Sequence, residues 1–165
     1  MLIALTGFMC SGKTTVGEIV ADALGCPFLD LDRIIEKKEG RSIRDIFAAG
    51  GEDAFRRLEK KALEDTVQKY RETTAVLALG GGTVTVPGAV NLLHDNTLCI
   101  YLEASRETLQ TRLSTAAQDR PLASGDWQSR LQARRPLYEA AAQVTIGTDE
   151  WPPEEIADEI IISCL

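Results

Sequence analysis

Residues 2–14 of this chain read LIALTGFMCSGKT, an apolar run followed directly by a glycine-rich turn. The second part, Gly7–Thr14, matches the pattern GxxxxGK(S/T) in full. Glycines adopt backbone angles that other residues avoid, so successive N–H groups can turn toward an anion at the start of a helix. Lys13 is spaced to reach the β- and γ-phosphates of a nucleotide, and the Thr14 hydroxyl to bind Mg²⁺. The stretch therefore predicts a phosphate-binding loop between a buried strand and a helix.

Outside this loop, short apolar runs alternate with amphipathic stretches along the chain. Such alternation is typical of a parallel sheet covered by helices on both faces, with ligands beyond the carboxyl ends of the strands. Strands are predicted at Leu2–Thr6, Pro27–Leu29, Thr74–Leu79, Leu98–Leu102 and Val144–Ile146. Helices are predicted at Gly12–Leu24, Ser42–Ala48, Glu52–Tyr70, Pro87–His94, Arg106–Leu113, Trp127–Ala142 and Pro152–Ser163, with Pro87 in a first turn and a kink or restart at Pro136.

Length and composition favour a single α/β enzyme domain. The chain has 165 residues, of which 44% are hydrophobic, and this is enough for one core. Its net charge of −7 argues against nucleic-acid binding, so an anionic ligand would need local cations. The four cysteines have no disulfide or metal spacing, which predicts free thiols in a reducing cytosol. The apolar start is too short for a signal peptide or a membrane span, so we expect a cytoplasmic monomer without a membrane partner.

Two carboxylates follow the second predicted strand. Alternation along a strand would send Asp30 and Asp32 to the same side, where both could face the phosphate loop. Phosphorylation of a hydroxyl needs one carboxylate near the metal and one near the acceptor. The alternative is a solvated loop or a helix cap for Arg33–Lys38.

Arginine pairs on two predicted helices are candidates for binding an anionic substrate. One guanidinium from Arg56 or Arg57 and one from Arg134 or Arg135 could clamp a carboxylate by paired hydrogen bonds, although charged helix residues are usually solvated. The run Gly80–Gly82 after the third strand would let a substrate approach the backbone closely, or would form a plain turn.

The segment Ala116–Asp126 has no apolar period and is predicted to be a mobile loop. Arg120 within it could close over the phosphates and stabilise charge, or be an ordinary exposed residue. Cys10 is either a small residue that fills a loop position or a thiol activated by the helix N-terminus and Lys13.

Together these motifs resemble the shikimate kinase family, from Leu2 to about Ile146. The matching pieces, in order, are GFMCSGKT, FLDLD, GRSIRDIF, GGEDAFRRLE, LALGGGTV, YLEAS, RPL and RRPLY. The resemblance implies a three-layer P-loop kinase fold, with a five-stranded parallel sheet in the order 2-3-1-4-5 flanked by helices. It also implies one domain over residues 1–165, with a mobile lid at about 113–125 and substrate-binding helices at about 33–60.

The resemblance also implies a role for each matching position. Lys13, Asp32 and Arg120 are the catalytic residues, and Thr14 and Asp30 hold Mg²⁺, Asp30 through water. Shikimate is bound by Asp32, Arg56, Gly80, Gly81, Gly82 and Arg134, where the two arginines hold its carboxylate. ATP is bound by Gly7, Cys10, Ser11, Gly12, Lys13, Thr14, Thr15, Arg112 and Arg120, where Arg112 stacks on the adenine.

Other functions remain open at this level. A guanine-specific GTPase would carry an NKxD element, which the sequence lacks. Another small-molecule kinase of this architecture, such as gluconate or nucleoside monophosphate kinase, is the alternative enzyme. A non-catalytic nucleotide-binding module would bind ATP without releasing ADP in response to an acceptor.

Overall fold

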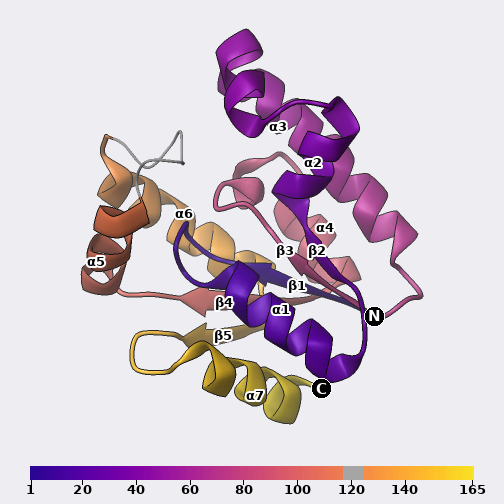
Figure 1. Cartoon of the computed structure of the whole chain (residues 1–165), viewed down its shortest axis with the longest axis vertical. Coiled ribbons are helices and arrows are strands. Elements are labelled where there is room, and N and C mark those ends of the chain that lie inside the picture. The colour runs from indigo at the N-terminus through magenta and orange to yellow at the C-terminus, as the bar shows by residue number, and fades with distance from the viewer. Residues whose placement is uncertain (117–124) are drawn as a thin grey trace.

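A parallel sheet organises the computed structural model, which describes residues 1–116 and 125–165. Its strands are β1 (Leu2–Thr6), β2 (Phe28–Asp30), β3 (Ala75–Ala78), β4 (Leu98–Glu103) and β5 (Val144–Gly147). They lie in the order β2-β3-β1-β4-β5, and every neighbouring pair is parallel (Figure 1). The predicted strand order is therefore confirmed.

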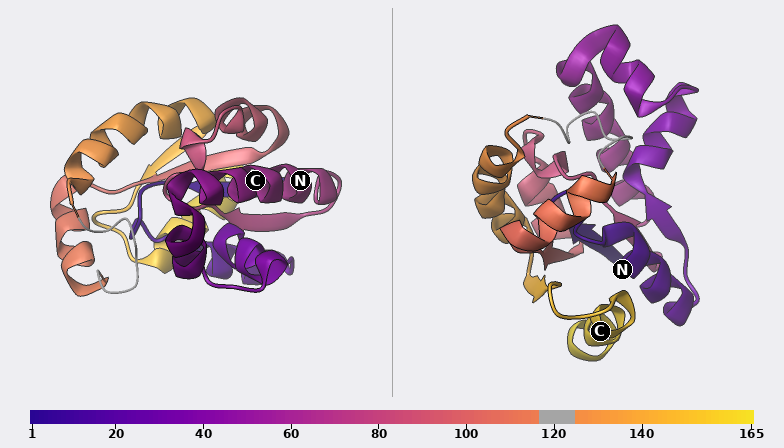
Figure 2. Two further views of the ribbon diagram at one scale, coloured as in Figure 1. Left: turned by 90° about the horizontal axis from the view of Figure 1, so that it is seen from above. Right: turned by 60° about the vertical axis from the view of Figure 1, so that its left-hand side comes forward.

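Alternating side chains of the central strand supply two separate cores. Leu2 and Ala4 point into one cluster of buried residues, and Ile3 and Leu5 point into the other. The first cluster is covered by α3 (Ile43–Lys69), α4 (Ala89–Asn96), α5 (Arg106–Ala116) and α6 (Trp127–Ala141). The second is covered by α1 (Lys13–Leu24) and α7 (Pro153–Cys164), which gives three layers (Figure 2).

One helix follows its strand without a loop, and the sequence predicted it only as the alternative of a helix cap before Arg33–Lys38. Asp30 ends β2 and also caps α2 (Leu31–Glu39), because its Oδ1 accepts a hydrogen bond from the Arg33 N–H at 3.2 Å. The two helices predicted at Ser42–Ala48 and Glu52–Tyr70 are two segments of α3, joined at Gly51 with φ 73° and ψ −171°. Helices α2 and α3 extend beyond the sheet at the carboxyl end of β2 (Figure 1).

Two predicted helix boundaries are wrong, and the restart considered at Pro136 is absent. Pro87 precedes α4 rather than starting it, because Gly88 in a left-handed conformation is the N-cap. Helix α6 runs through Pro136 without a restart. Helix α5 continues to Ala116, so residues 113–116 of the expected lid are helical. Arg120 and the remaining lid residues up to 124 lie outside the described residues.

Two further expectations concern the cysteines and the helices. Cys10, Cys26, Cys99 and Cys164 are all free, as predicted. Among the helices of residues 1–116 and 125–165, none combines the length and the hydrophobicity that a membrane crossing requires.

Candidate active site

The loop between β1 and α1 forms one wall of the site. Gly7 has φ 149°, and a Cβ there would lie 2.6 Å from the Leu102 carbonyl oxygen, so only glycine fits. Gly12, with φ 98°, is the N-cap of α1. Because glycine has no side chain to cap the first amides of the helix, these N–H groups can bind an anion.

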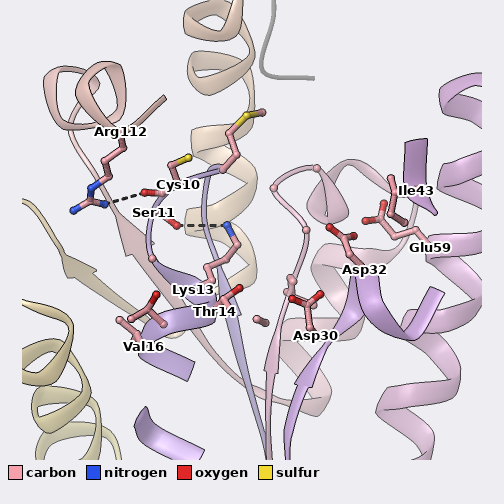
Figure 3. Close-up of a pocket in the computed structure, with 18 of the residues that line it drawn as sticks. Cys10, Ser11, Lys13, Thr14, Val16, Asp30, Asp32, Ile43, Glu59 and Arg112 are labelled. Carbon is pink, nitrogen blue, oxygen red and sulfur yellow. Dashed lines mark hydrogen bonds between the residues drawn. The ribbon is translucent and has the colours of Figure 1, made fainter. Parts of the chain in front are cut away.

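Lys13 is buried against its own loop. Its Nζ donates hydrogen bonds to the Gly7 carbonyl at 2.8 Å and the Phe8 carbonyl at 2.7 Å, and Ser11 Oγ lies 3.5 Å away (Figure 3). Phosphate oxygens can replace these carbonyls as acceptors, because an ammonium group donates in any direction.

Asp30 and Asp32 face the loop from the other side of the cavity (Figure 3). The two aspartates lie on the same side of the cavity, but strand alternation, the predicted reason, is not the cause. Only Asp30 belongs to β2, whereas Asp32 lies in the first turn of α2, so strand alternation does not relate them. The helix cap considered as an alternative is present, and it directs Asp32 into the cavity.

Asp32 is a partly buried carboxylate close to two others, Asp30 and Glu59. Burial raises the pKa of its carboxyl from 3.8 to about 6; Asp30 and Glu59 add to the rise, and Lys13 and Arg56 oppose it. Its Oδ1 is buried and has no hydrogen-bond partner among the described residues. A buried acceptor of this kind is suited to a hydroxyl donor on a ligand.

Arg56 is held by two carboxylates on its own helix. Its Nη1 donates to Glu59 Oε1 at 2.7 Å and its Nη2 to Glu52 Oε1 at 3.2 Å. Glu59 is fully buried and also accepts a hydrogen bond from the Thr83 hydroxyl at 2.8 Å. A Cβ on Gly82 would lie 2.3 Å from Arg56 Nη2, so the guanidinium packs directly against the glycine turn.

The second guanidinium enters from α6. Arg134 is buried, and its Cζ lies 5.9 Å from the centre of the Phe8 ring. Arg57 and Arg135, which follow Arg56 and Arg134 in sequence, are exposed. Consecutive helical residues point about 100° apart, so only one member of each pair can face the cavity.

These side chains line one cavity of about 870 Å³ at the carboxyl ends of β1, β2 and β3. Of the predicted site residues, the following line it: Cys10, Ser11, Gly12, Lys13, Thr14, Thr15, Asp30, Asp32, Arg56, Gly80, Gly81, Gly82, Arg112 and Arg134. Gly7 lies behind the loop and does not line it. Arg120 is outside the described part of the chain.

Around Arg112, the cavity is lined by a predicted residue and by others that the sequence analysis did not name. Arg112 Nη1 donates to the Cys10 carbonyl at 2.9 Å, which fixes the helix α5 beside the loop (Figure 3). Trp151, Pro153 and Ile156 line the same cavity and provide apolar surface for a flat ring. No motif marks them, because they are close to Arg112 only in the folded chain.

Two oxygen donors fit a divalent cation that arrives with phosphates. The Thr14 hydroxyl and the Asp30 carboxylate line the cavity on opposite sides. Within residues 1–116 and 125–165, no cluster of three or more His, Cys, Asp or Glu residues could hold a metal alone. Mg²⁺ in kinases is typically bound by one or two protein oxygens together with phosphate oxygens and water, which matches this donor set.

Sequence comparisons identify relatives over nearly the whole chain. The shikimate kinase family profile matches residues 9–165. The shikimate kinase of Enterococcus faecalis is 41% identical over 164 residues, covering 96% of this chain and 95% of the relative. That of Dehalococcoides mccartyi strain BAV1 is 38% identical over 162 residues, covering 96% of this chain and 90% of the relative.

Solved structures agree with the sequence relatives. Shikimate kinase from Acinetobacter baumannii, in complex with shikimate, superposes with a TM-score of 0.89 at 33% identity, covering 99% of this chain and 93% of that one. The Aquifex aeolicus enzyme superposes with a TM-score of 0.83 at 35% identity, covering 99% and 96%. On the family profile, these relatives and the shared fold, the chain belongs to the shikimate kinase family.

Proposed function

We propose that this chain transfers the γ-phosphoryl group of ATP to the 3-hydroxyl of shikimate. The observation that carries the proposal is the single cavity in which a phosphate loop faces a carboxylate and two guanidinium groups. Family membership, and the shikimate bound to the A. baumannii relative, support the choice of acceptor. A mere nucleotide-binding module would need the loop but not Asp32, Arg56 and Arg134.

On the acceptor side, Arg56 and Arg134 would hold the shikimate carboxylate by charge-assisted hydrogen bonds. The Asp32 Oδ1 would accept a hydrogen bond from the hydroxyl that reacts. The backbone of Gly80–Gly82 carries no side chains, so the substrate ring can lie directly against it. These contacts fix both ends of a small acidic ring.

On the nucleotide side, the amides of residues 10–15 would surround the phosphates. Lys13 would exchange the Gly7 and Phe8 carbonyls for β- and γ-phosphate oxygens, and Arg112 would lie against the adenine. Arg120 would bind the phosphates from the lid. Thr14, and Asp30 through water, would hold Mg²⁺, which neutralises charge on the phosphates when bound.

The reaction exchanges one P–O bond for another. The acceptor oxygen bonds to the γ-phosphorus as the bond to the β–γ bridging oxygen breaks, and ADP leaves in line. The hydroxyl proton passes to Asp32, whose carboxyl, with a pKa raised to about 6, is ionised at neutral pH. Positioning and charge neutralisation supply most of the rate enhancement.

The setting of the enzyme follows from the same features. We propose that residues 1–165 act as one kinase domain with a lid at about 113–125, as a monomer in the cytoplasm. The net charge of −7 supports the absence of a nucleic-acid partner.

A panel of acceptors tests the activity. ADP release is measured with Mg·ATP and shikimate, quinate or gluconate, and with EDTA in place of Mg²⁺. We expect turnover with shikimate that EDTA abolishes, and little with gluconate. Faster turnover with gluconate, or no acceptor-dependent release at all, would replace the proposal with one of the alternatives.

Lys13→Ala provides the matched loss of function. We expect it to lower kcat with shikimate by at least about 100-fold, because it removes the positive charge that would stabilise the transferred phosphoryl group. Lys37→Ala, which changes an exposed lysine of α2, is the control and should turn over normally. Near-normal turnover of Lys13→Ala would contradict the role of the loop.

A further inference from the structure

Tyr138 is a buried residue directly behind the glycine turn of the site, and no part of the mechanism above uses it. It lies one helical turn after Arg134 on α6, so both side chains are on the same face. It is fully buried, and its hydroxyl donates a short hydrogen bond to the Gly81 carbonyl. The phenol therefore joins helix α6 to the glycine turn that follows β3.

The same phenol oxygen interacts with the site arginine. Burial raises the pKa of Tyr138, while the Arg134 guanidinium opposes the rise by its charge and as a hydrogen-bond donor, and Arg56 opposes it more weakly. A tyrosine hydroxyl can accept one hydrogen bond while it donates another. Tyr138 thus donates to Gly81 and lies within the influence of the Arg134 guanidinium, which could donate to the same oxygen.

The glycine turn connects this pair to the other arginine. Gly82 follows Gly81, and the Arg56 guanidinium packs against its Cα so closely that no Cβ would fit. A continuous path therefore runs from Arg134 through Tyr138, Gly81 and Gly82 to Arg56. The two charged groups that would grip one carboxylate are held apart by this path.

We propose that Tyr138 is a positioning residue for the substrate carboxylate, and that its hydroxyl sets the separation of the Arg134 and Arg56 guanidinium groups. The inference rests on the proposed function, because it gives these arginines a common carboxylate to bind. A bidentate grip depends on the angle and spacing of both donors, so a small displacement of one weakens the pair.

The chain contains a natural control for this role. Tyr101 stacks on Tyr138 with ring centres 5.1 Å apart, and it is equally buried. Burial raises the pKa of the Tyr101 hydroxyl, and Arg135, the exposed neighbour of Arg134, opposes the rise. Arg134 therefore influences one of the two stacked tyrosines and Arg135 the other, and of these two arginines only Arg134 lines the cavity.

The test compares Tyr138→Phe with Tyr101→Phe, since each removes one hydroxyl and keeps the ring. We expect Tyr138→Phe to raise the KM and the Kd for shikimate by about tenfold, with kcat and the KM for ATP within about threefold. Tyr101→Phe should leave all four values within about twofold. A merely structural Tyr138 would lower the melting temperature without this selective change, and an unchanged shikimate KM would overturn the inference.

A double-mutant cycle locates the effect. In an Arg134→Ala background, Tyr138→Phe should cause no further loss of shikimate affinity, because the group that it positions is gone. Additive losses would contradict the link. A wild-type chain that neither binds nor phosphorylates shikimate would overturn the proposed function as well, whereas an active wild type with an indifferent Tyr138 overturns only this inference.

A second measurement leaves Tyr138 in place. The chain has three tyrosines, so 3-fluorotyrosine labelling gives three ¹⁹F resonances, and Tyr70→Phe and Tyr101→Phe identify two of them. We expect saturation with shikimate to shift the Tyr138 resonance, because carboxylate binding draws Arg134 partly away from the phenol. A Tyr138 signal that does not move would count against the proposal.

Discussion

At the scale of single residues, Asp32 combines a place in the cavity with a raised pKa. Its carboxylate is crowded by Asp30 and Glu59, and burial raises its pKa to about 6. A base with this pKa is ionised at pH 7 yet takes up a proton readily. The same environment destabilises the fold, because the charge that catalysis needs is poorly solvated.

Asp32 therefore predicts the pH dependence of activity. We expect kcat/KM for shikimate to fall about tenfold per pH unit below about pH 6, as the free carboxylate is protonated. Asp32→Asn should lower kcat by about 10²–10⁴-fold and remove this acidic limb. An unchanged limb in the variant would mean that another group titrates.

The same variant should be more stable at neutral pH. The pKa of Asp32 in the folded chain is above its ordinary value of 3.8, so ionising this carboxyl destabilises the fold. The free energy of unfolding is therefore unaffected below pH 3.8 and falls as the pH rises through about 6. The difference corresponds to at most about 3 kcal/mol. Melting curves should show Asp32→Asn as more stable than wild type at pH 7.5, and the two as equal near pH 3.5.

Gly82 is predicted to control Arg56 through shape alone. A Cβ at this position would meet the Arg56 Nη2 at 2.3 Å, so the flexible guanidinium must move, while the backbone angles suit alanine. We expect Gly82→Ala to raise the shikimate KM by about 10–100-fold and to leave the KM for ATP nearly unchanged. Gly147→Ala, where a Cβ would meet nothing within 4 Å, is the control. Equal KM values in the two variants would contradict the prediction.

At the scale of elements, the site depends on the end of β2 and on the bend in α3. The direct passage from β2 to α2 places one aspartate at the end of a strand and the next in the first turn of a helix. The bend at Gly51 then separates the part of α3 that carries Ile43 and Phe47, which line the cavity, from the part that carries Arg56 and Glu59.

Gly51 provides the test at this scale. Its φ of 73° and ψ of −171° belong to glycine almost exclusively, and a Cβ would meet nothing within 4 Å, so alanine would be strained only in the backbone. We expect Gly51→Ala to lose about 1–3 kcal/mol of unfolding free energy in urea and to raise the shikimate KM several-fold. Ala49→Gly, in the exposed helix nearby, should lose about 1 kcal/mol without changing the KM. A larger rise in the shikimate KM for Ala49→Gly than for Gly51→Ala would show that the bend does not shape the site.

At the scale of the whole molecule, the sheet separates stability from function. Both cores lie on its faces, whereas the cavity lies beyond the carboxyl ends of the central strands. Lys13, Arg56, Arg112 and Arg134 converge there although the chain as a whole carries a charge of −7. The attraction for anionic substrates is therefore local, and the overall charge serves solubility.

Local patterns were enough to predict much of this arrangement. The backbone of Gly7–Thr14 depends on residues within a few positions of one another, so its motif indicates both the loop and its ligand. Strand and helix periodicity predicted every strand and nearly every helix, and the resemblance to shikimate kinases supplied the strand order that the structure confirms. The loop-free start of α2 was predicted only as an alternative, because a single capping aspartate has no period to detect.

Contacts between distant segments could not be predicted from local sequence patterns. Whether Arg56 or Arg57, and Arg134 or Arg135, faces the cavity depends on how α3 and α6 are rotated against the sheet. The links from Glu59 to Thr83 and from Tyr138 to Gly81 join residues that are 24 and 57 positions apart. Burial of these polar groups requires partners, and packing alone brings the partners within reach.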